Sequence, residues 1–177
     1  MSTGGDGQVL IQDGLAKSGA FAAQLTETSN RNSFAYIKKT FSTSPTDVWL
    51  SGDFIVTADG GSGSTVPIIK LIDTGGIEQA FIYRRGQNGG KIVLSAGGST
   101  IQTSGNLPLN TWGHFELHLI TAGSGLSTIE LYLDGVVIYQ TSTGNLGTIG
   151  LTTVQIGDEN VKQAFSLVAD NILVETK

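Results

Sequence analysis

The chain of 177 residues carries 15 acidic and 10 basic side chains, which gives a net charge of −5 at neutral pH. This acidic balance argues against nucleic acid and anionic membranes as partners, because both require a basic surface. With no cysteine, the chain has no disulfide, no thiolate metal site and no cysteine nucleophile. The 25 glycines cluster between apolar runs, which is typical of many short strands joined by tight turns.

Strand-like segments follow one another along the whole chain, separated by glycine- and serine-rich turns such as Asp59–Thr65 and Ala122–Thr128. In chain order they are Gln8–Gln12, Ala20–Leu25, Phe34–Phe41, Val48–Thr57, Val66–Ile72, Glu78–Arg85, Lys91–Ser95, Thr100–Thr103, Trp112–Thr121, Thr128–Leu133, Val136–Thr141, Thr153–Ile156 and Ala164–Glu175. So many strands must bury one face of each sheet on another sheet. The pattern therefore predicts an all-β fold, a single two-sheet antiparallel β-sandwich of residues 8–177. Residues 1–7 would be flexible or held by a neighbour in an assembly.

One β-hairpin is especially clear, in the stretch LYLDGVVIY at Leu131–Tyr139. Its Asp134-Gly135 pair suits a two-residue type I′ turn, which needs positive φ at both positions. With this turn, the register pairs Leu133 with Val136, Leu131 with Ile138 and Ile129 with Gln140 on one face. The predicted core combines this face with apolar positions of the other strands: Phe21, Leu25, Phe41, Leu50, Phe54, Val56, Ile69, Leu71, Phe115, Leu117, Leu119, Ile129, Leu131, Leu133, Val136, Ile138 and Ile156.

Motif-like segments occur near both ends of the chain and in its second half. They are KSGAFAAQL (Lys17–Leu25), WGHFELHL (Trp112–Leu119), LYLDGVVI (Leu131–Ile138), and the closing Ile156-Gly-Asp with LVADNILV (Leu167–Val174). Together, and in this order, they resemble bacterial laminin-G-like domains of the concanavalin A-like lectin and glucanase superfamily. The resemblance implies a jelly roll. It leaves the function to the site residues, because this fold hosts lectins, glycanases, lyases and adhesion modules.

Catalytic motifs of that superfamily do not occur in the chain. Its glycosidases share an E-x-D-x-x-E strand, which sets a nucleophile and an acid/base on one sheet face. Its alginate-lyase-like members carry R-x-E-x-R and Q-x-H strands. None of these patterns is present, so we expect the protein not to be an enzyme.

An aromatic and polar sheet face is the candidate ligand-binding site. It forms if the strands that carry the following residues share one sheet: Trp49, Tyr83, Arg85, Glu116, His118 and Tyr132. Aromatic platforms flanked by hydrogen-bonding groups suit sugar rings, which have apolar faces and hydroxyl edges. Two basic pairs, Lys38-Lys39 and Arg84-Arg85, are instead expected to be solvated strand edges, because alternation sends their members to opposite faces.

Calcium is the cofactor that the resemblance implies, held by carboxylates and carbonyls near the final strand. Asp170 matches the acid of the closing motif, and Asp158 lies in the oxygen-rich turn Asp158-Glu159-Asn160. Alternatively, Asp170 caps a turn or faces solvent.

A second possible metal site is the set His114, Glu116 and His118, which alternate along one strand and could converge on zinc. The alternative is a half-buried sheet face opposite Phe115 and Leu117.

These observations predict a non-catalytic, lectin-like carbohydrate-binding or adhesion module, with a polysaccharide or glycan as its partner. The alternative is a structural subunit or displayed domain of a virion, fibre or surface filament, with a neighbouring copy as partner in a homo-oligomer. Either protein would be extracellular or surface-associated. Membrane insertion is not expected, since no apolar run reaches about 18 residues, and the start MSTGGDGQ shows no signal peptide.

Overall fold

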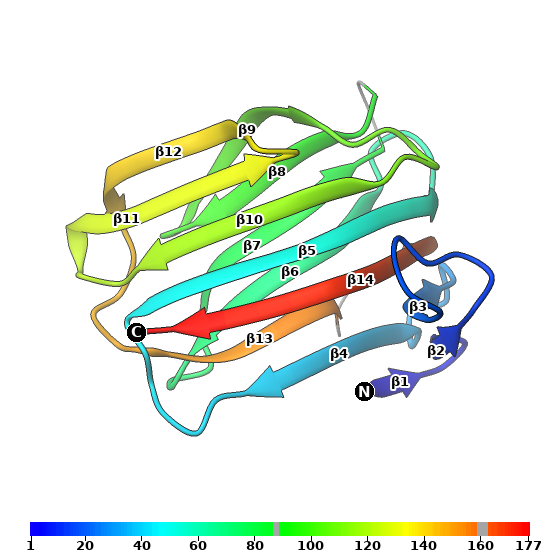
Figure 1. Cartoon of the computed structure of the whole chain (residues 1–177), viewed down its shortest axis with the longest axis horizontal. Helices are drawn as coiled ribbons and strands as arrows, with labels where there is room; N and C mark the ends of the chain where they lie inside the picture. The colour runs from blue at the N-terminus through cyan, green and yellow to red at the C-terminus, as the bar shows by residue number, and fades with distance from the viewer. Residues whose placement is uncertain (87–88, 159–162) are drawn as a thin grey trace.

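The computed structural model describes residues 1–86, 89–158 and 163–177, and the described chain folds into a β-sandwich (Figure 1). Its strands are β1 (Ser2–Gly4), β2 (Gln8–Gln12), β3 (Ala22–Glu27), β4 (Phe34–Thr40), β5 (Asp47–Ala58), β6 (Thr65–Asp73), β7 (Glu78–Arg85), β8 (Lys91–Ala96), β9 (Ser99–Asn106), β10 (Gly113–Ile120), β11 (Ser124–Leu133), β12 (Val136–Asn145), β13 (Leu151–Asp158) and β14 (Phe165–Thr176). They form two antiparallel sheets of seven strands, which confirms the predicted fold class.

Each sheet mixes strands from distant parts of the chain. The order β1-β4-β13-β6-β7-β8-β9 defines what we call the β6 sheet, and β12-β11-β10-β5-β14-β3-β2 defines the β5 sheet. Residues 2–4, in the segment expected to be flexible or held by a neighbour, pair with β4 as β1. Among the described residues, no helix is long and apolar enough to cross a membrane.

The hairpin between β11 and β12 has the predicted turn, with a φ of 52° at Asp134 and of 75° at Gly135. Leu133 pairs with Val136 as expected, but the next two expected pairs are wrong, because Leu131 pairs with Tyr139 and Ile129 pairs with Thr141. The shift follows Tyr132, which pairs with Val137, so one extra residue lies in β12 at this point. Such a bulge adds local twist to a sheet at its edge.

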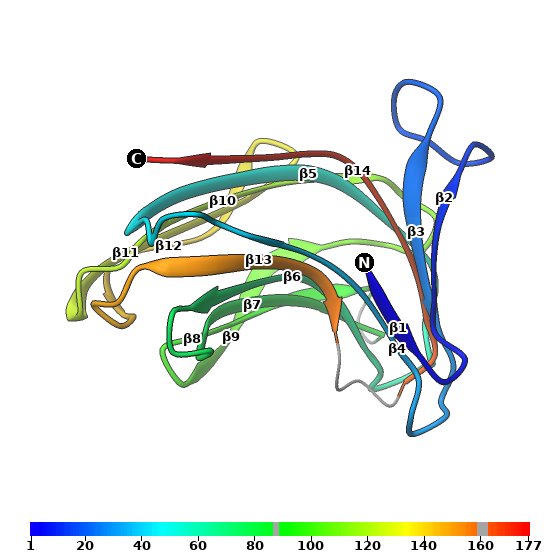
Figure 2. The same cartoon turned by 90° about the horizontal axis from the view of Figure 1, so that it is seen from below.

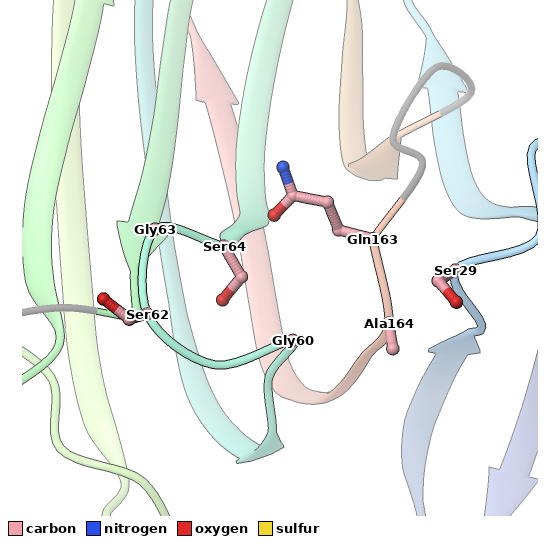
Figure 3. A pocket seen from close by; sticks show the side chains of 7 residues that line it. All are labelled: Ser29, Gly60, Ser62, Gly63, Ser64, Gln163 and Ala164. Atoms are coloured by element: carbon pink, nitrogen blue, oxygen red, sulfur yellow. The ribbon is translucent and has the colours of Figure 1, made fainter.

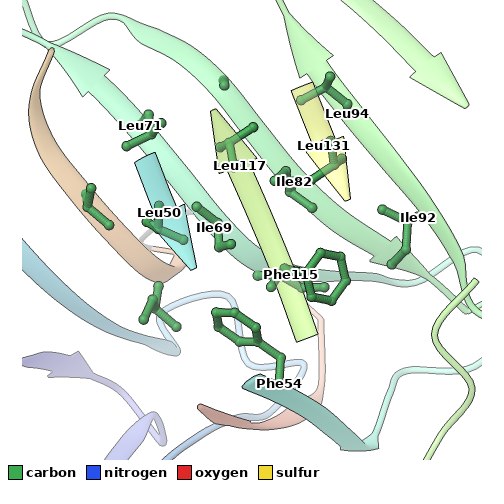
Figure 4. Close-up of a cluster of buried hydrophobic side chains, with 14 of the residues drawn as sticks. Leu50, Phe54, Ile69, Leu71, Ile82, Ile92, Leu94, Phe115, Leu117 and Leu131 are labelled. Carbon is green, nitrogen blue, oxygen red and sulfur yellow. The ribbon is translucent and has the colours of Figure 1, made fainter. Parts of the chain in front are cut away.

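The core lies between the sheets and is built from large aliphatic and aromatic side chains of both (Figure 4). Phe54 and Phe115 of the β5 sheet meet edge to face, with their ring centroids 5.8 Å apart. Two predicted core residues are exposed: Phe21 at 63% and Val136 at 64%. Phe21 precedes β3, and Val136 opens the edge strand β12, so neither lies where the sheets face each other. Phe41 is only partly buried against the core.

Both sheets are curved in the same direction. Seen from below, β5 and β14 arch over β13, β6 and β7, which bend the same way (Figure 2). The outer face of the β6 sheet is therefore concave, and the outer face of the β5 sheet is convex. A concave sheet gathers the side chains on its outer face toward one another, so this face is where an extended ligand can be surrounded.

Candidate functional site

Basic and aromatic side chains of β6 and β7 occupy the concave outer face. Ile69 and Leu71 of β6 and Ile82 of β7 belong to the core. Since side chains alternate along a strand, Lys70 and Tyr83 project from the opposite face. Phe81 and Arg85 of β7 lie on the same outer face as Lys70 and Tyr83.

A row of side chains on this outer face crosses four neighbouring strands. Lys38 of β4 pairs with Gln155 of β13, which pairs with Lys70 of β6, which pairs with Phe81 of β7. Although this face is the outer one, Gln155 is only 2% exposed and Lys70 only 6%. Neighbouring groups therefore enclose the middle of the row, while Lys38 stands toward its β4 end.

Tyr83 connects this row to Arg85. Its ring centroid lies 5.1 Å from that of Phe81, and the Arg85 guanidinium carbon lies 5.7 Å from the Tyr83 centroid. The Nη2 atom of Arg85 also donates a hydrogen bond of 3.4 Å to the Tyr83 hydroxyl oxygen. Lys70 holds its ammonium 5.0 Å from the Phe81 centroid and 3.5 Å from a carboxylate oxygen of Glu78.

The concave site is defined here as Lys38, Lys70, Phe81, Tyr83, Arg85 and Gln155. It brings three cations onto one face of a chain whose net charge is −5. Partly enclosed cations attract an anionic ligand more strongly than solvated ones, because solvent screens them less. A guanidinium also matches a carboxylate with two parallel N–H donors. The arrangement suits a carboxylated sugar, and the Tyr83 hydroxyl adds a group that can transfer a proton.

The structure divides the six predicted ligand-binding residues between two sheets. Trp49, Glu116, His118 and Tyr132 lie on β5, β10 and β11 of the β5 sheet, whereas Tyr83 and Arg85 lie on β7 of the β6 sheet. The prediction of one common face is therefore wrong, because β7 does not join the sheet that contains β5 and β10. Binding by either subset stays a prediction.

His118 is the centre of the cluster on the convex face. Its ring stacks on Trp49, with centroids 4.0 Å apart and planes inclined by 11°. Its Nε2 atom lies 3.0 Å from Asp47 Oδ1, and its Nδ1 atom lies 2.9 Å from Glu130 Oε2. These contacts hold the ring firmly within the sheet face.

The zinc alternative gains no support from this geometry. The Nδ1 atom of His114 lies 3.2 Å from Asp53 Oδ1, away from the partners of His118. In the part of the chain that the structure describes, no three His, Asp or Glu side chains are grouped as a metal site.

Asp170, a predicted calcium ligand, binds backbone amides of a neighbouring loop. Its Oδ2 accepts hydrogen bonds from the amides of Lys17 and Ser18, at 2.8 and 2.9 Å. Its Oδ1 accepts one of 2.8 Å from the amide of Asn171. Asp158 closes β13, but its side chain lies outside what the structure describes, as do Glu159 and Asn160. Calcium binding therefore stays a prediction.

Lys38, Lys70 and Gln155 were not singled out by the sequence patterns. Lys70 carries a usable signal, since it is the lone charged residue in the apolar run Val66–Ile72. The expectation of solvated strand edges is wrong for Arg84, which is 3% exposed. Gln155 and Lys38 become neighbours of Lys70 only through the strand order β4-β13-β6.

Comparisons with known proteins give matches at the level of structure. No protein-family model and no curated protein sequence matches the chain. An endo-β-1,4-glucuronan lyase from the fungus Trichoderma reesei superposes with a TM-score of 0.79, at 11% identity, over 98% of this chain and 88% of the lyase. The cellulose-induced protein Cip1 gives 0.75 at 20% identity, over 97% and 86%. The marine PL7 alginate lyase AlyA1 from Zobellia galactanivorans gives 0.62 at 10% identity, over 90% and 79%.

These matches correct the functional interpretation made from the sequence. A non-catalytic binding or adhesion module, with a structural subunit as the alternative and no enzyme activity, was expected from the missing motifs. The solved structures that share the fold over most of their length instead include glucuronan and alginate lyases, which are catalytic proteins. Short motifs are a weak guide on this fold, because side chains on different strands can build a site without any fixed sequence spacing. The chain is a jelly-roll β-sandwich with the concanavalin A-like fold.

Proposed function

We propose that the protein is a polysaccharide lyase that cleaves a uronic-acid-containing polymer by β-elimination at the concave site. The observation that carries this proposal is the row Lys38–Gln155–Lys70 beside the Arg85–Tyr83 hydrogen bond. The similarity to lyases named for glucuronan and alginate, both polymers of uronic acids, supports the same substrate class.

Elimination makes two demands that this face meets. A proton must leave the carbon that carries the carboxylate, and the bond from the neighbouring carbon to the glycosidic oxygen must break. A double bond forms between the two carbons, and the leaving oxygen takes up a proton. The negative charge that accumulates on the carboxylate during proton removal is stabilised by fixed cations aimed at it. Lys70 and Arg85 supply such cations, and Gln155 supplies an amide between Lys38 and Lys70.

Tyr83 is the residue that we assign to proton transfer. The guanidinium of Arg85 has donors only, so the Tyr83 oxygen accepts in their contact. The phenolic proton is thereby left to donate to the glycosidic oxygen of a bound polymer. The resulting phenolate, which accepts from Arg85, takes up the proton that leaves the carbon and becomes a hydroxyl again. Tyr83 is 8% exposed, so its ring is fixed by packing and only its hydroxyl end has to meet the substrate.

The location of the protein and its structural subtype are two further parts of this proposal. The protein would act outside the cell, where polymeric uronates are met as extracellular material. The laminin-G-like subtype suggested by the sequence motifs stays a prediction.

The test is to incubate the purified protein with glucuronan, with alginate and with a neutral β-glucan, and to follow the ultraviolet absorbance of the new conjugated double bond. We expect absorbance to rise with a polyuronate and not with the neutral glucan. Tyr83→Phe should lower kcat by about 100-fold or more, the usual contribution of one proton-transferring side chain.

The matched control is Tyr132→Phe on the convex face, which should leave both kcat and Tm unchanged. Polyuronates that all remain intact in the presence of the wild-type protein would overturn the proposal. So would a Tyr83→Phe variant that retains full activity.

A further inference from the structure

A cavity of about 430 Å³ lies among three connections, β3–β4, β5–β6 and β13–β14 (Figure 3). None of the seven described residues that line it is charged. Hydroxyl groups, one amide and glycine backbone line it: Ser29, Ser62, Ser64, Gln163, Gly60 and Gly63. Its volume falls in the range of small-molecule sites, about 300–1,000 Å³.

The Ser64 hydroxyl is the feature of this cavity that packing does not explain. The residue is 6% exposed, and its Oγ atom has no hydrogen-bond partner among the described residues. A buried hydroxyl without a partner destabilises a fold, so such groups are rare unless something else satisfies them. Figure 3 shows the Ser64 side chain turned into the space enclosed by the Gly60–Ser64 loop.

The loop that carries Ser64 is held in place by a buried ion pair. Asp59, which starts the loop, lies 2.5 Å from Nη1 of Arg84, and its other oxygen accepts the Gly61 amide at 2.9 Å. The Ser64 amide donates to the Gly61 carbonyl at 3.0 Å. Gly61 has a φ of 88°, which a side chain would oppose, so glycine at this position lets the loop make its turn.

The cavity adjoins the Arg85 end of the concave site. The residue after Ser64 is Thr65, which pairs with Arg85 across β6 and β7. The Gly86 amide, next after Arg85, donates to the Ser64 carbonyl at 2.9 Å. A polymer that extends along β7 past Tyr83 and Arg85 would therefore approach the loop that lines this cavity.

We infer that the cavity is a subsite for a neutral, hydroxyl-rich sugar unit of the polysaccharide, bound next to the uronate at the concave site. This inference rests on the proposed function for the polymer, but it concerns a separate binding contact. A second uronate would meet no cation among the described lining residues, whereas sugar hydroxyls can both donate to and accept from Ser64, Ser29 and the loop backbone. The substrate would then combine uronate with neutral sugar rather than repeat uronate alone.

Ser64→Ala separates binding from folding. Because the hydroxyl has no partner in the described chain, its removal should leave Tm unchanged or raise it. Affinity for a tetrasaccharide of alternating glucose and glucuronate, measured by calorimetry, should fall by about tenfold, the value of one hydrogen bond. Affinity for a glucuronate tetrasaccharide should change less.

Two further variants sharpen the experiment. Ser127→Ala is the matched control, since Ser127 is fully buried but donates to the Gly123 carbonyl at 2.8 Å and accepts the Ala122 amide at 3.1 Å. It should lower Tm and leave affinity unchanged. Ala164→Trp, which fills the cavity, should abolish the preference for the alternating tetrasaccharide.

The outcomes distinguish this subsite from the proposed reaction. A Ser64→Ala variant with lower Tm and unaltered affinity overturns the subsite, as does unaltered affinity in Ala164→Trp, even if polyuronates are cleaved. If no polymer is cleaved but tetrasaccharide binding still depends on Ser64, the subsite stands and the lyase proposal fails.

Discussion

The ammonium group of Lys70 lies 5.0 Å from the centre of the Phe81 ring, directly opposite it in the register of β6 and β7. This contact places a nearly buried cation in the middle of the concave face, with its aliphatic stem among packed side chains. A cation over an aromatic face keeps its charge at a moderate cost, because the ring quadrupole attracts it.

Lys70→Met should retain the packing and remove the charge. We expect kcat/KM for a polyuronate to fall about 10- to 100-fold, in line with the roughly 1.5–3 kcal/mol of a hydrogen bond to a charged group. Kinetics at low and high salt would measure it, and the variant should also be less sensitive to salt. Lys39→Met, on the opposite face of β4 from Lys38, is the control, and an equal loss there would count against a specific role for Lys70.

Arg84→Met should destabilise the fold without altering the concave site, because Arg84 is not one of the residues of that site. Arg84 binds Asp59 and donates from Nε to the Leu107 carbonyl at 2.7 Å, while only 3% exposed. Removal of one partner leaves the Asp59 carboxylate buried without its cation, which costs about 3–5 kcal/mol. Chemical denaturation would measure the loss. The double variant with Asp59→Leu should recover part of it, and a single variant as stable as the wild type would refute this account.

Gly135→Val tests the hairpin turn. The residue has a φ of 75°, which a β-branched side chain strongly resists, although the space around it is open. We expect a loss of about 1–3 kcal/mol in unfolding free energy. Activity per folded molecule should be unchanged, since the turn belongs to the β5 sheet. Gly135→Asn, which tolerates positive φ, is the control and should lose clearly less.

Calcium binding near Asp170 can be tested by thermal unfolding. Three amides use three of the approximately four lone-pair positions of this carboxylate, so one position on Oδ1 is left for an ion. If calcium binds the folded chain, Tm should rise with calcium and fall with a chelator. Asp170→Asn should remove the response. A wild-type Tm that ignores both additives would end the calcium proposal.

The local part of the structure was determined by the sequence alone. Asp134-Gly135 set the turn, because positive φ at two successive residues is a local demand of the backbone. Alternation placed Leu117 and Leu131 inside, because the two-residue period of a strand fixes which face is apolar. The sandwich followed from the number of such strands.

Only the tertiary structure decided which strands are neighbours and therefore which side chains meet. Tyr83 and Trp49 both alternate away from apolar residues, yet they lie on the outer faces of opposite sheets. Lys38, Gln155 and Lys70 are far apart in the chain and form one row only because β13 inserts between β4 and β6. Strand order depends on how the whole chain closes its core, and no local pattern encodes it. The curvature that makes one outer face concave likewise arises from the packing of the two twisted sheets.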